Sequence, residues 1–122
     1  MNKPVLALTM GDAAGIGPEI TVKALARKDL RASSRLLAIG DRAILEDALR
    51  FAPPGSGLSF SEPADPEDPS RPSVPGTVPL LQPCSALEGI RPGVLSPEGG
   101  RGAVAYVRAA VDLARRGLAD GI

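Results

Sequence analysis

Two short hydrophobic runs, each bounded by a glycine, organise the first 51 residues of the chain. The first run covers residues 5–10 and the second lies within residues 35–40. Continuous apolar runs of this length are typical of strands buried on both faces of a parallel sheet. Hydrophobic residues at helical spacing follow each run. The order strand–helix–strand–helix therefore predicts an α/β fold, with a mostly parallel sheet flanked by helices.

Both predicted helices have an apolar side that should pack against this sheet. The first begins at Pro18 and ends near Lys28, and its apolar residues are Ile20, Val22, Ala24 and Leu25. The second runs from about Arg42 to Arg50 behind Asp41, a residue type that favours the N-cap position. Its inward-facing residues are Ile44, Leu45, Ala48 and Leu49.

Prolines interrupt the pattern between residues 52 and 76. Seven of the 13 prolines lie in this segment, together with four acidic residues and one arginine. Because proline disfavours helix interiors and central strands, we predict a Pro-rich surface loop over 52–76, with residues 58–60 as a candidate short edge strand.

Regular structure is predicted again from residue 77. Residues 77–81 read as a short strand, and Ser96 followed by Pro97 is typical of a helix N-cap and first turn. Gly117 is a natural stop for that helix. The hydrophobic residues that repeat at helical spacing along it are Val104, Val107, Val111, Ala114 and Leu118.

Composition excludes several classes of protein. Fourteen basic residues balance 14 acidic ones, and aromatic residues make up only 2% of the chain, which argues against nucleic-acid binding. One cysteine excludes a disulfide framework, and the absence of histidine removes the commonest acid–base group and metal ligand. Cys84 therefore has no histidine to activate it as a nucleophile. No run is long enough to cross a membrane and no signal peptide is evident, so we expect a cytoplasmic protein.

Candidate chemistry is concentrated in residues 11–19, Gly-Asp-Ala-Ala-Gly-Ile-Gly-Pro-Glu, between the first strand and the first helix. Glycines allow positive φ and close approach of a ligand to the backbone, and a helix N-terminus offers free N–H groups. The spacing fits neither the Walker A loop nor the Rossmann fingerprint. Asp12 and Glu19 would repel a bare phosphate but suit a hydroxyl, an amine or a bridging water. A tight strand-to-helix turn explains these glycines equally well.

Residues 7–20, continued by Val22-Lys23-Ala24-Leu25, resemble the T-x-G-D-P-A-G-I-G-P-E-I opening of the 4-hydroxythreonine-4-phosphate dehydrogenase family. Ala13 stands where the family usually has proline. Isocitrate and isopropylmalate dehydrogenases, which share the fold, have a related opening. Residues 37–41 also resemble the family's second strand and turn, and residues 110–122 resemble the helix that leads into its T-x-P-x-x-K strand.

The resemblance implies the N-terminal βαβα portion of an isocitrate/isopropylmalate dehydrogenase-like fold. Residues 1–122 would form the N-terminal part of a larger two-domain enzyme, because the family's T-x-P-x-x-K and histidine-containing segments have no counterpart here. Such an enzyme oxidises the C3 hydroxyl of 4-phosphooxy-L-threonine with NAD or NADP, with decarboxylation, in pyridoxal 5′-phosphate biosynthesis. It acts as a homodimer with a divalent metal ion (Zn, Mg or Co).

Within this chain, the candidate cofactor-facing residues are Gly11, Asp12, Gly15 and Gly17. The catalytic residues and metal ligands are expected beyond residue 122, so we expect the isolated chain to be inactive. Two alternatives remain. A relative of the same family could act on 4-phosphothreonate or a dihydrodiol dicarboxylate, and a truncated α/β module could have no catalytic role.

Overall fold

The computed structural model describes residues 2–122, and its centre is a four-stranded parallel sheet with the strand order β1-β2-β6-β3. These strands are β1 (Val5–Thr9), β2 (Arg35–Ile39), β6 (Val78–Leu81) and β3 (Phe60–Ser61). Residues Leu37, Ala38 and Ile39 of β2 are completely buried. This burial explains the continuous apolar run, because a central parallel strand has no solvent-facing side.

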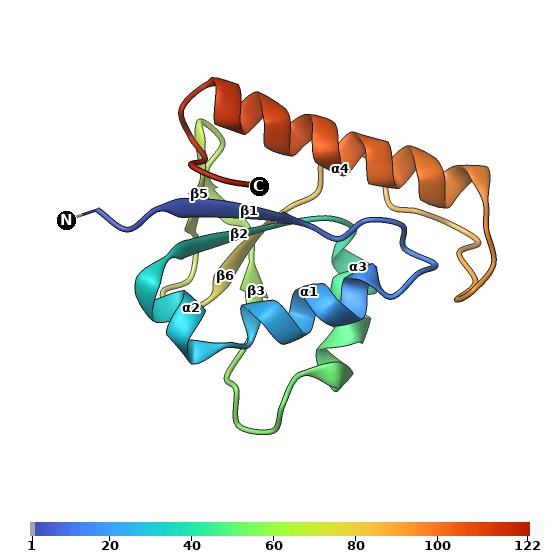
Figure 1. The fold of residues 1–122 in the computed structure, drawn as a ribbon, viewed down its shortest axis with the longest axis horizontal. Helices are drawn as coiled ribbons and strands as arrows, with labels where there is room; N and C mark the ends of the chain where they lie inside the picture. The colour runs from blue at the N-terminus through green and yellow to red at the C-terminus, as the bar shows by residue number, and fades with distance from the viewer. Residues whose placement is uncertain (1) are drawn as a thin grey trace.

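Helices cover both faces of the sheet, so the predicted α/β fold is confirmed (Figure 1). On one face lie α1 (Gly17–Leu25), α2 (Lys28–Ser33) and α3 (Arg42–Ala48), which continues into the short 3₁₀ helix η1 (Leu49–Phe51). On the other face lies the long helix α4 (Pro97–Arg115). The sequence pattern did not predict α2, which has no buried residue and therefore no apolar side to reveal it.

Two predicted helix starts are confirmed by their caps. The Asp41 carboxylate accepts a hydrogen bond from Ile44 N at 3.1 Å at the start of α3. The Ser96 hydroxyl accepts one from Gly99 N at 3.1 Å at the start of α4. Both caps satisfy N–H groups that have no partner within the helix.

The Pro-rich segment contains more regular structure than its composition predicts. Besides β3, which overlaps the predicted edge strand at Phe60, it forms an antiparallel hairpin of β4 (Pro63–Asp65) and β5 (Asp68–Pro72). Prolines at both ends of this hairpin pair with each other, and the ladder has a register shift between Pro63 and Asp65. Proline is tolerated here because the hairpin is a separate two-stranded sheet with free edges.

The buried side of α4 differs from the stripe of valines in the sequence. Val104, Val107 and Val111 are 51%, 48% and 41% exposed. The residues of α4 that are buried are Gly99, Gly102, Tyr106, Ala110 and Leu113. Two glycines and a tyrosine were not counted as apolar positions, although small residues let the helix approach the sheet closely. The predicted apolar side of α1 is confirmed only in part. Val22 and Leu25 are fully buried, but Ile20 is 54% exposed.

Candidate functional site

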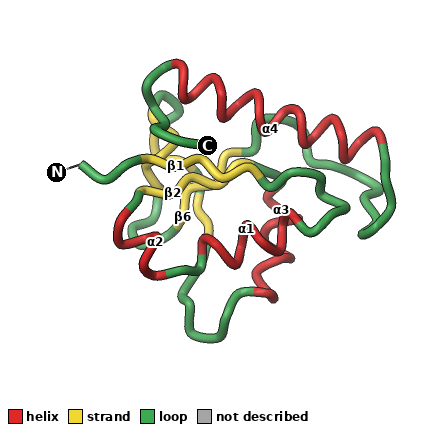
Figure 2. The backbone as a smooth tube through the Cα atoms, viewed as in Figure 1, coloured by secondary structure: helices red, strands yellow, loops and turns green. Residues whose placement is uncertain are grey.

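The glycine-containing loop follows β1 at the carboxyl end of the parallel strands (Figure 2). Open α/β sheets bind their ligands at this edge. Gly11 begins the loop with φ +71°, a backbone conformation that side-chain-bearing residues rarely adopt. A Cβ at Gly11 would meet no atom within 4 Å, so its requirement is conformational and not steric.

Asp12 stabilises the loop through two hydrogen bonds within it. Its Oδ1 accepts a hydrogen bond from Ala14 N at 2.8 Å, and its carbonyl oxygen accepts one from Gly15 N at 3.0 Å. The same carboxylate packs against the first turn of α4, where a Cβ added to Gly99 would lie 2.5 Å from Oδ1. The carboxylate therefore lies at the N-terminal end of α4, which the helix dipole makes favourable for a negative charge.

Gly15 and Gly17 have different surroundings. A Cβ at Gly17 would lie 1.9 Å from the Met10 carbonyl oxygen, so any side chain there collides with the backbone of the preceding strand. A Cβ at Gly15 would meet only Asp12 O, at an ordinary contact distance of 3.5 Å. Gly17 thus allows α1 to pack against β1, whereas Gly15 is exposed on the loop's outer surface.

A cavity of about 460 Å³ adjoins the loop on this edge of the sheet. Of the four candidate residues, only Gly15 lines it, with Ala13 and Ile16 beside it. The opposite wall comes from α3 and η1, and the floor from the segment that contains Ile90 and Pro92. The loop is tied to that segment by a hydrogen bond from Gly93 N to Ala14 O at 2.7 Å.

The charges around this cavity are mixed. Glu19 pairs with Lys23 at 2.9 Å, and Asp47 lies 3.7 Å from Arg50. Ile16 is 70% exposed at its rim. Apolar atoms next to carboxylates suit a ligand with hydroxyl or amino groups better than a bare phosphate.

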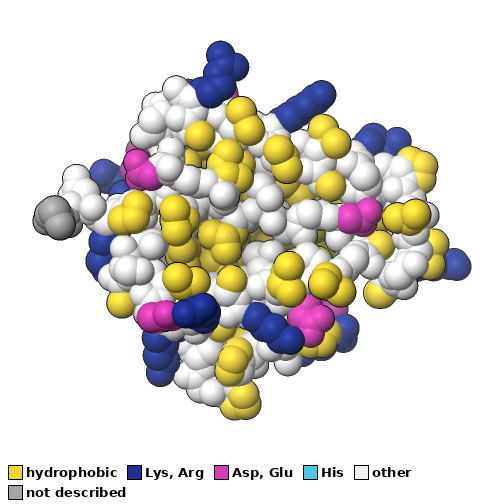
Figure 3. Space-filling model, viewed as in Figure 1, with side chains coloured by type: hydrophobic (Ala, Val, Ile, Leu, Met, Phe, Trp, Pro, Cys, Tyr) yellow, Lys and Arg dark blue, Asp and Glu magenta, His cyan; other side chains and the backbone are white. Residues whose placement is uncertain are grey.

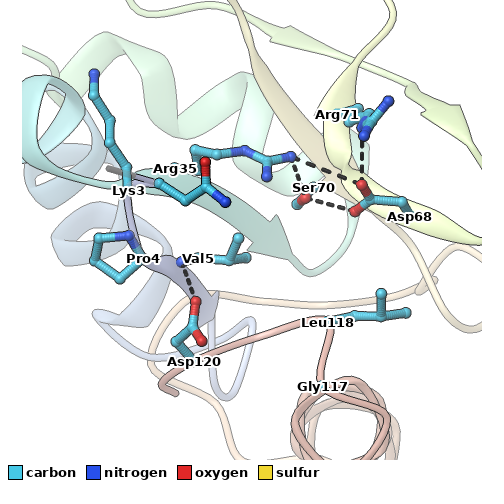
Figure 4. A pocket seen from close by; sticks show the side chains of 11 residues that line it. Lys3, Pro4, Val5, Arg35, Asp68, Ser70, Arg71, Gly117, Leu118 and Asp120 are labelled. Carbon is cyan, nitrogen blue, oxygen red and sulfur yellow. Dashed lines mark hydrogen bonds and ion pairs between the residues drawn. The ribbon is translucent and has the colours of Figure 1, made fainter.

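A cavity of about 780 Å³ lies elsewhere, beside the amino ends of β1 and β2 (Figure 4). Three of its charged side chains, Arg35, Asp68 and Arg71, form one network with Ser70. Asp68 accepts hydrogen bonds from the Ser70 hydroxyl at 2.6 Å and from Arg71 at 2.9 Å, and Arg35 donates to Ser70 at 2.6 Å. The Ser70 hydrogen bond holds the pKa of Asp68 below its ordinary value, with further help from Arg35 and Arg71. These pairs join β2 to the hairpin and have a structural role.

Sequence reasoning missed a buried polar cluster behind β2 and β6. Asp41 is 1% exposed, and besides capping α3 it accepts a hydrogen bond from Leu87 N at 2.8 Å. Tyr106 is fully buried, and its hydroxyl has no hydrogen-bond partner within residues 2–122. Burial raises the pKa of Tyr106, and the nearby Cys84 thiol and Asp41 carboxylate raise it further. Only the N-cap role of Asp41 could be read from the sequence.

The described residues do not fit a metal ion. Within residues 2–122 no three His, Cys, Asp or Glu side chains converge on one point.

Comparison with known proteins gives strong matches along the chain. It is 45% identical over 122 residues to the D-threonate 4-phosphate dehydrogenase of Bordetella bronchiseptica, and 33% identical over 123 residues to the 4-hydroxythreonine-4-phosphate dehydrogenase of a Synechococcus species. Each match covers 98% of this chain. The chain is a homologue of these dehydrogenases.

The structure agrees with this homology. A crystal structure of 4-hydroxythreonine-4-phosphate dehydrogenase from Burkholderia phymatum superposes with a TM-score of 0.81 at 33% identity, covering 98% of this chain and 35% of that one. The chain spans about a third of the length of the curated dehydrogenases it matches. No family model matches the chain. No helix within the described residues is long and apolar enough to cross a membrane.

Proposed function

We propose that residues 1–122 form the N-terminal part of a larger, homodimeric, two-domain dehydrogenase that oxidises a small phosphorylated hydroxy acid with NAD or NADP. The observation that carries this proposal is the match to dehydrogenases over 98% of the chain, at 45% and 33% identity. The share of those enzymes that the chain covers, about a third, supports its role as one part of a larger catalytic unit.

For the substrate, we propose D-threonate 4-phosphate first and 4-hydroxy-L-threonine 4-phosphate second. The relative named for the former is 45% identical to this chain, against 33% for the relative named for the latter. Both compounds carry a hydroxyl on the carbon β to a carboxylate. Oxidation there would pass a hydride to a bound NAD or NADP and release a proton. The resulting β-keto acid loses CO₂ and leaves a three-carbon phosphorylated ketone.

The proposed contribution of this chain is to shape one wall of the cofactor and substrate cleft. The loop formed by Gly11, Asp12, Gly15 and Gly17 lies at the ligand-binding edge of the sheet, and Gly15 faces the cavity of about 460 Å³. Asp12 accepts a hydrogen bond from Ala14 N and packs against α4, and its proposed role is to fix the shape of the loop. A bound NAD or NADP would supply the hydride acceptor, and the loop would form one wall of the cleft beside it.

The test is a chimera in which residues 1–122 replace the matching third of the Bordetella bronchiseptica enzyme. We expect the purified chimera to reduce NAD or NADP with D-threonate 4-phosphate and a divalent cation, and the 122-residue chain alone to show no turnover. A folded chimera that oxidises neither substrate would leave the non-catalytic module as the better description. Faster turnover with 4-hydroxy-L-threonine 4-phosphate would reverse the order of the two substrates.

A further inference from the structure

A second cavity at the amino ends of the strands is lined by basic and hydroxyl groups. Its volume is about 230 Å³, and it lies between the end of α2, the starts of β2 and β6, and strand β5 of the hairpin. Among residues 2–122, no acidic residue lines it. Its polar lining consists of Arg31, Ser34, Arg35, Ser70 and Thr77.

This cavity is enclosed by elements that lie beside one another within residues 31–79. Strands β2 and β6 are neighbours in the sheet. Residues 120–121 pair with β1 on the other side of β2, where Ala7 N donates to Gly121 O at 3.0 Å and Val5 O accepts from Asp120 N at 2.8 Å. The loop that begins at Gly11 lies at the opposite, carboxyl edge of the strands. The cavity is therefore separate from the candidate cofactor cleft.

Arg31 has a buried donor without an acceptor. Its Nη2 donates to Ser56 O at 2.6 Å and to Ala26 O at 3.4 Å, which anchors one part of the guanidinium group. Its Nε is buried and has no hydrogen-bond partner within residues 2–122. A charged donor left without an acceptor is costly, so this group calls for a partner from outside the chain. An oxygen atom held in the adjoining cavity would supply that partner.

Arg35 brings a second positive charge to the same cavity. Its Nη2 donates to the Ser70 hydroxyl at 2.6 Å and lies 3.9 Å from Asp68 (Figure 4). Asp68 also accepts a hydrogen bond from Arg71 at 2.9 Å, so two arginines share one carboxylate. Together with Arg31, three arginines and one aspartate leave a net positive charge beside the cavity.

Positive charge alone does not identify a binding site on this protein. Lys and Arg side chains lie around the margin of the face of the molecule that Figure 3 shows. This cavity differs because its arginines adjoin buried hydroxyl groups, with Ser34 8% and Ser70 3% exposed. Guanidinium and hydroxyl groups together suit an oxyanion. Sites for drug-sized ligands have volumes of roughly 300–1,000 Å³, so this smaller cavity suits a small ion.

We propose that the cavity between α2, β2, β5 and β6 binds a phosphate-class oxyanion through Arg31 and Arg35. The ion is inorganic phosphate or the phosphate group of a small metabolite. It gives Arg31 Nε the acceptor that this group lacks, Arg35 contributes a second charge, and the Ser34 hydroxyl is a further donor. This site goes beyond the proposed function and does not depend on it.

The experiment titrates inorganic phosphate into the 122-residue chain at constant ionic strength, with sodium chloride as the reference salt. NMR follows the resonance of the Arg31 Nε–H group. We expect this resonance to shift and saturate with a dissociation constant of about 1 mM or lower. A parallel titration with glycerol 3-phosphate distinguishes the two sources of the ion. Binding about tenfold or more tighter than that of phosphate assigns the site to a phosphorylated metabolite, and equal or weaker binding assigns it to free phosphate.

Matched variants test which groups bind the ion, with calorimetry as the readout. Arg31→Gln removes a charge but keeps an amide that can donate to Ser56 O, and Pro72→Glu adds a carboxylate to the lining while both arginines remain. We expect each to weaken phosphate binding by about tenfold or more. Arg115→Gln and Leu95→Glu are the controls, because both side chains are exposed and neither lines the cavity. The controls should leave the dissociation constant unchanged.

Circular dichroism establishes that each variant is folded before it is titrated, and Pro72→Glu decides the question if Arg31→Gln does not fold. An Arg31 Nε–H resonance that does not respond up to about 20 mM phosphate would overturn the inference and leave buried water as the partner of this group. Control variants that weaken binding as much as Pro72→Glu would also overturn it, in favour of unspecific attraction by charge. None of these measurements involves dehydrogenase activity, so failure of the inference is distinguished from failure of the proposed function.

Discussion

At the scale of single residues, the glycines of the loop after β1 differ in the space available for a Cβ atom. At Gly17 it would meet the Met10 carbonyl oxygen at 1.9 Å, and at Gly15 only Asp12 O at 3.5 Å. At Gly11 it would meet nothing, but φ is +71°. The spacing of glycines in the sequence could not distinguish these cases. Both a lack of space for a side chain and a positive φ select glycine.

We predict that Gly17→Ala lowers the free energy of unfolding by about 3 kcal/mol, since the backbone of β1 or α1 must shift to admit the methyl group. Gly11→Ala should cost about 1 kcal/mol from the strained φ alone. Gly15→Ala should change stability by less than about 0.5 kcal/mol. Urea denaturation of the three variants measures the order. A Gly17→Ala variant as stable as Gly15→Ala would contradict the packing at Met10.

Gly15→Ala also tests the proposed ligand-facing role of the loop. In the chimera described above, we expect it to weaken cofactor or substrate binding by about threefold or more while stability stays unchanged. KM values for NAD, NADP and the phosphorylated substrate measure this effect. Unchanged KM values for all three would remove Gly15 from the cleft. Exposed Val74, far along the chain in the β5–β6 connection, offers a control position through Val74→Ala.

Asp68 links stability to pH. The Ser70 hydrogen bond and the two arginines lower its pKa in the folded protein, so ionised Asp68 stabilises the fold above its unfolded pKa of about 3.9. That contribution is lost as pH falls through the lowered folded pKa. Asp68→Asn should therefore cost about 1 kcal/mol near pH 6 and progressively less below about pH 4. Denaturation curves at several pH values measure the difference. Ser70→Ala, which removes the largest cause, should reproduce the trend.

At the scale of elements, Asp41 joins three parts of the structure. It follows β2, caps α3 through Ile44 N and holds the segment after β6 through Leu87 N at 2.8 Å. Because the carboxylate is 1% exposed, its removal leaves two N–H groups without a buried acceptor. We predict that Asp41→Ala lowers the free energy of unfolding by about 3 kcal/mol. Asp47→Ala, on the exposed side of the same helix, is the matched control and should cost less than about 0.5 kcal/mol.

The faces of the helices were harder to predict than their positions. Helix α4 was placed correctly by its cap, Ser96, but its valines lie outside and Tyr106 lies inside. Helical spacing identifies residues that share one side of a helix, but it does not show whether that side packs against the sheet or faces solvent. On α1, Val22→Ala should cost about 2 kcal/mol and Ile20→Ala less than about 0.5 kcal/mol in the isolated chain, by thermal unfolding. Equal losses would contradict the orientation of α1.

At the scale of the whole molecule, the α/β fold could be predicted because its signals are local: two apolar strands, two caps and the turns between them. The hairpin of β4 and β5 could not, because prolines lie in both of its strands and its attachment to β2 depends on residues distant in sequence. Arg35 of β2 donates to Ser70 of β5 at 2.6 Å, across a separation that no spacing rule connects. The same limit applies to the candidate site. Its loop was found from glycines, but the wall that α3 and η1 contribute depends on the tertiary arrangement.

The contacts between the start of the chain and residues 120–121 also have a consequence in time. Val5 N donates to Asp120 Oδ2 at 2.8 Å over a separation of 115 residues. On a ribosome that adds about 5–20 residues per second, Val5 is synthesised roughly 6 to 23 seconds before Asp120. During that interval Val5 O and Ala7 N lack the partners that residues 120–121 supply in the folded chain. The outer edge of β1 can therefore gain these contacts only after nearly all of residues 1–122 have been synthesised.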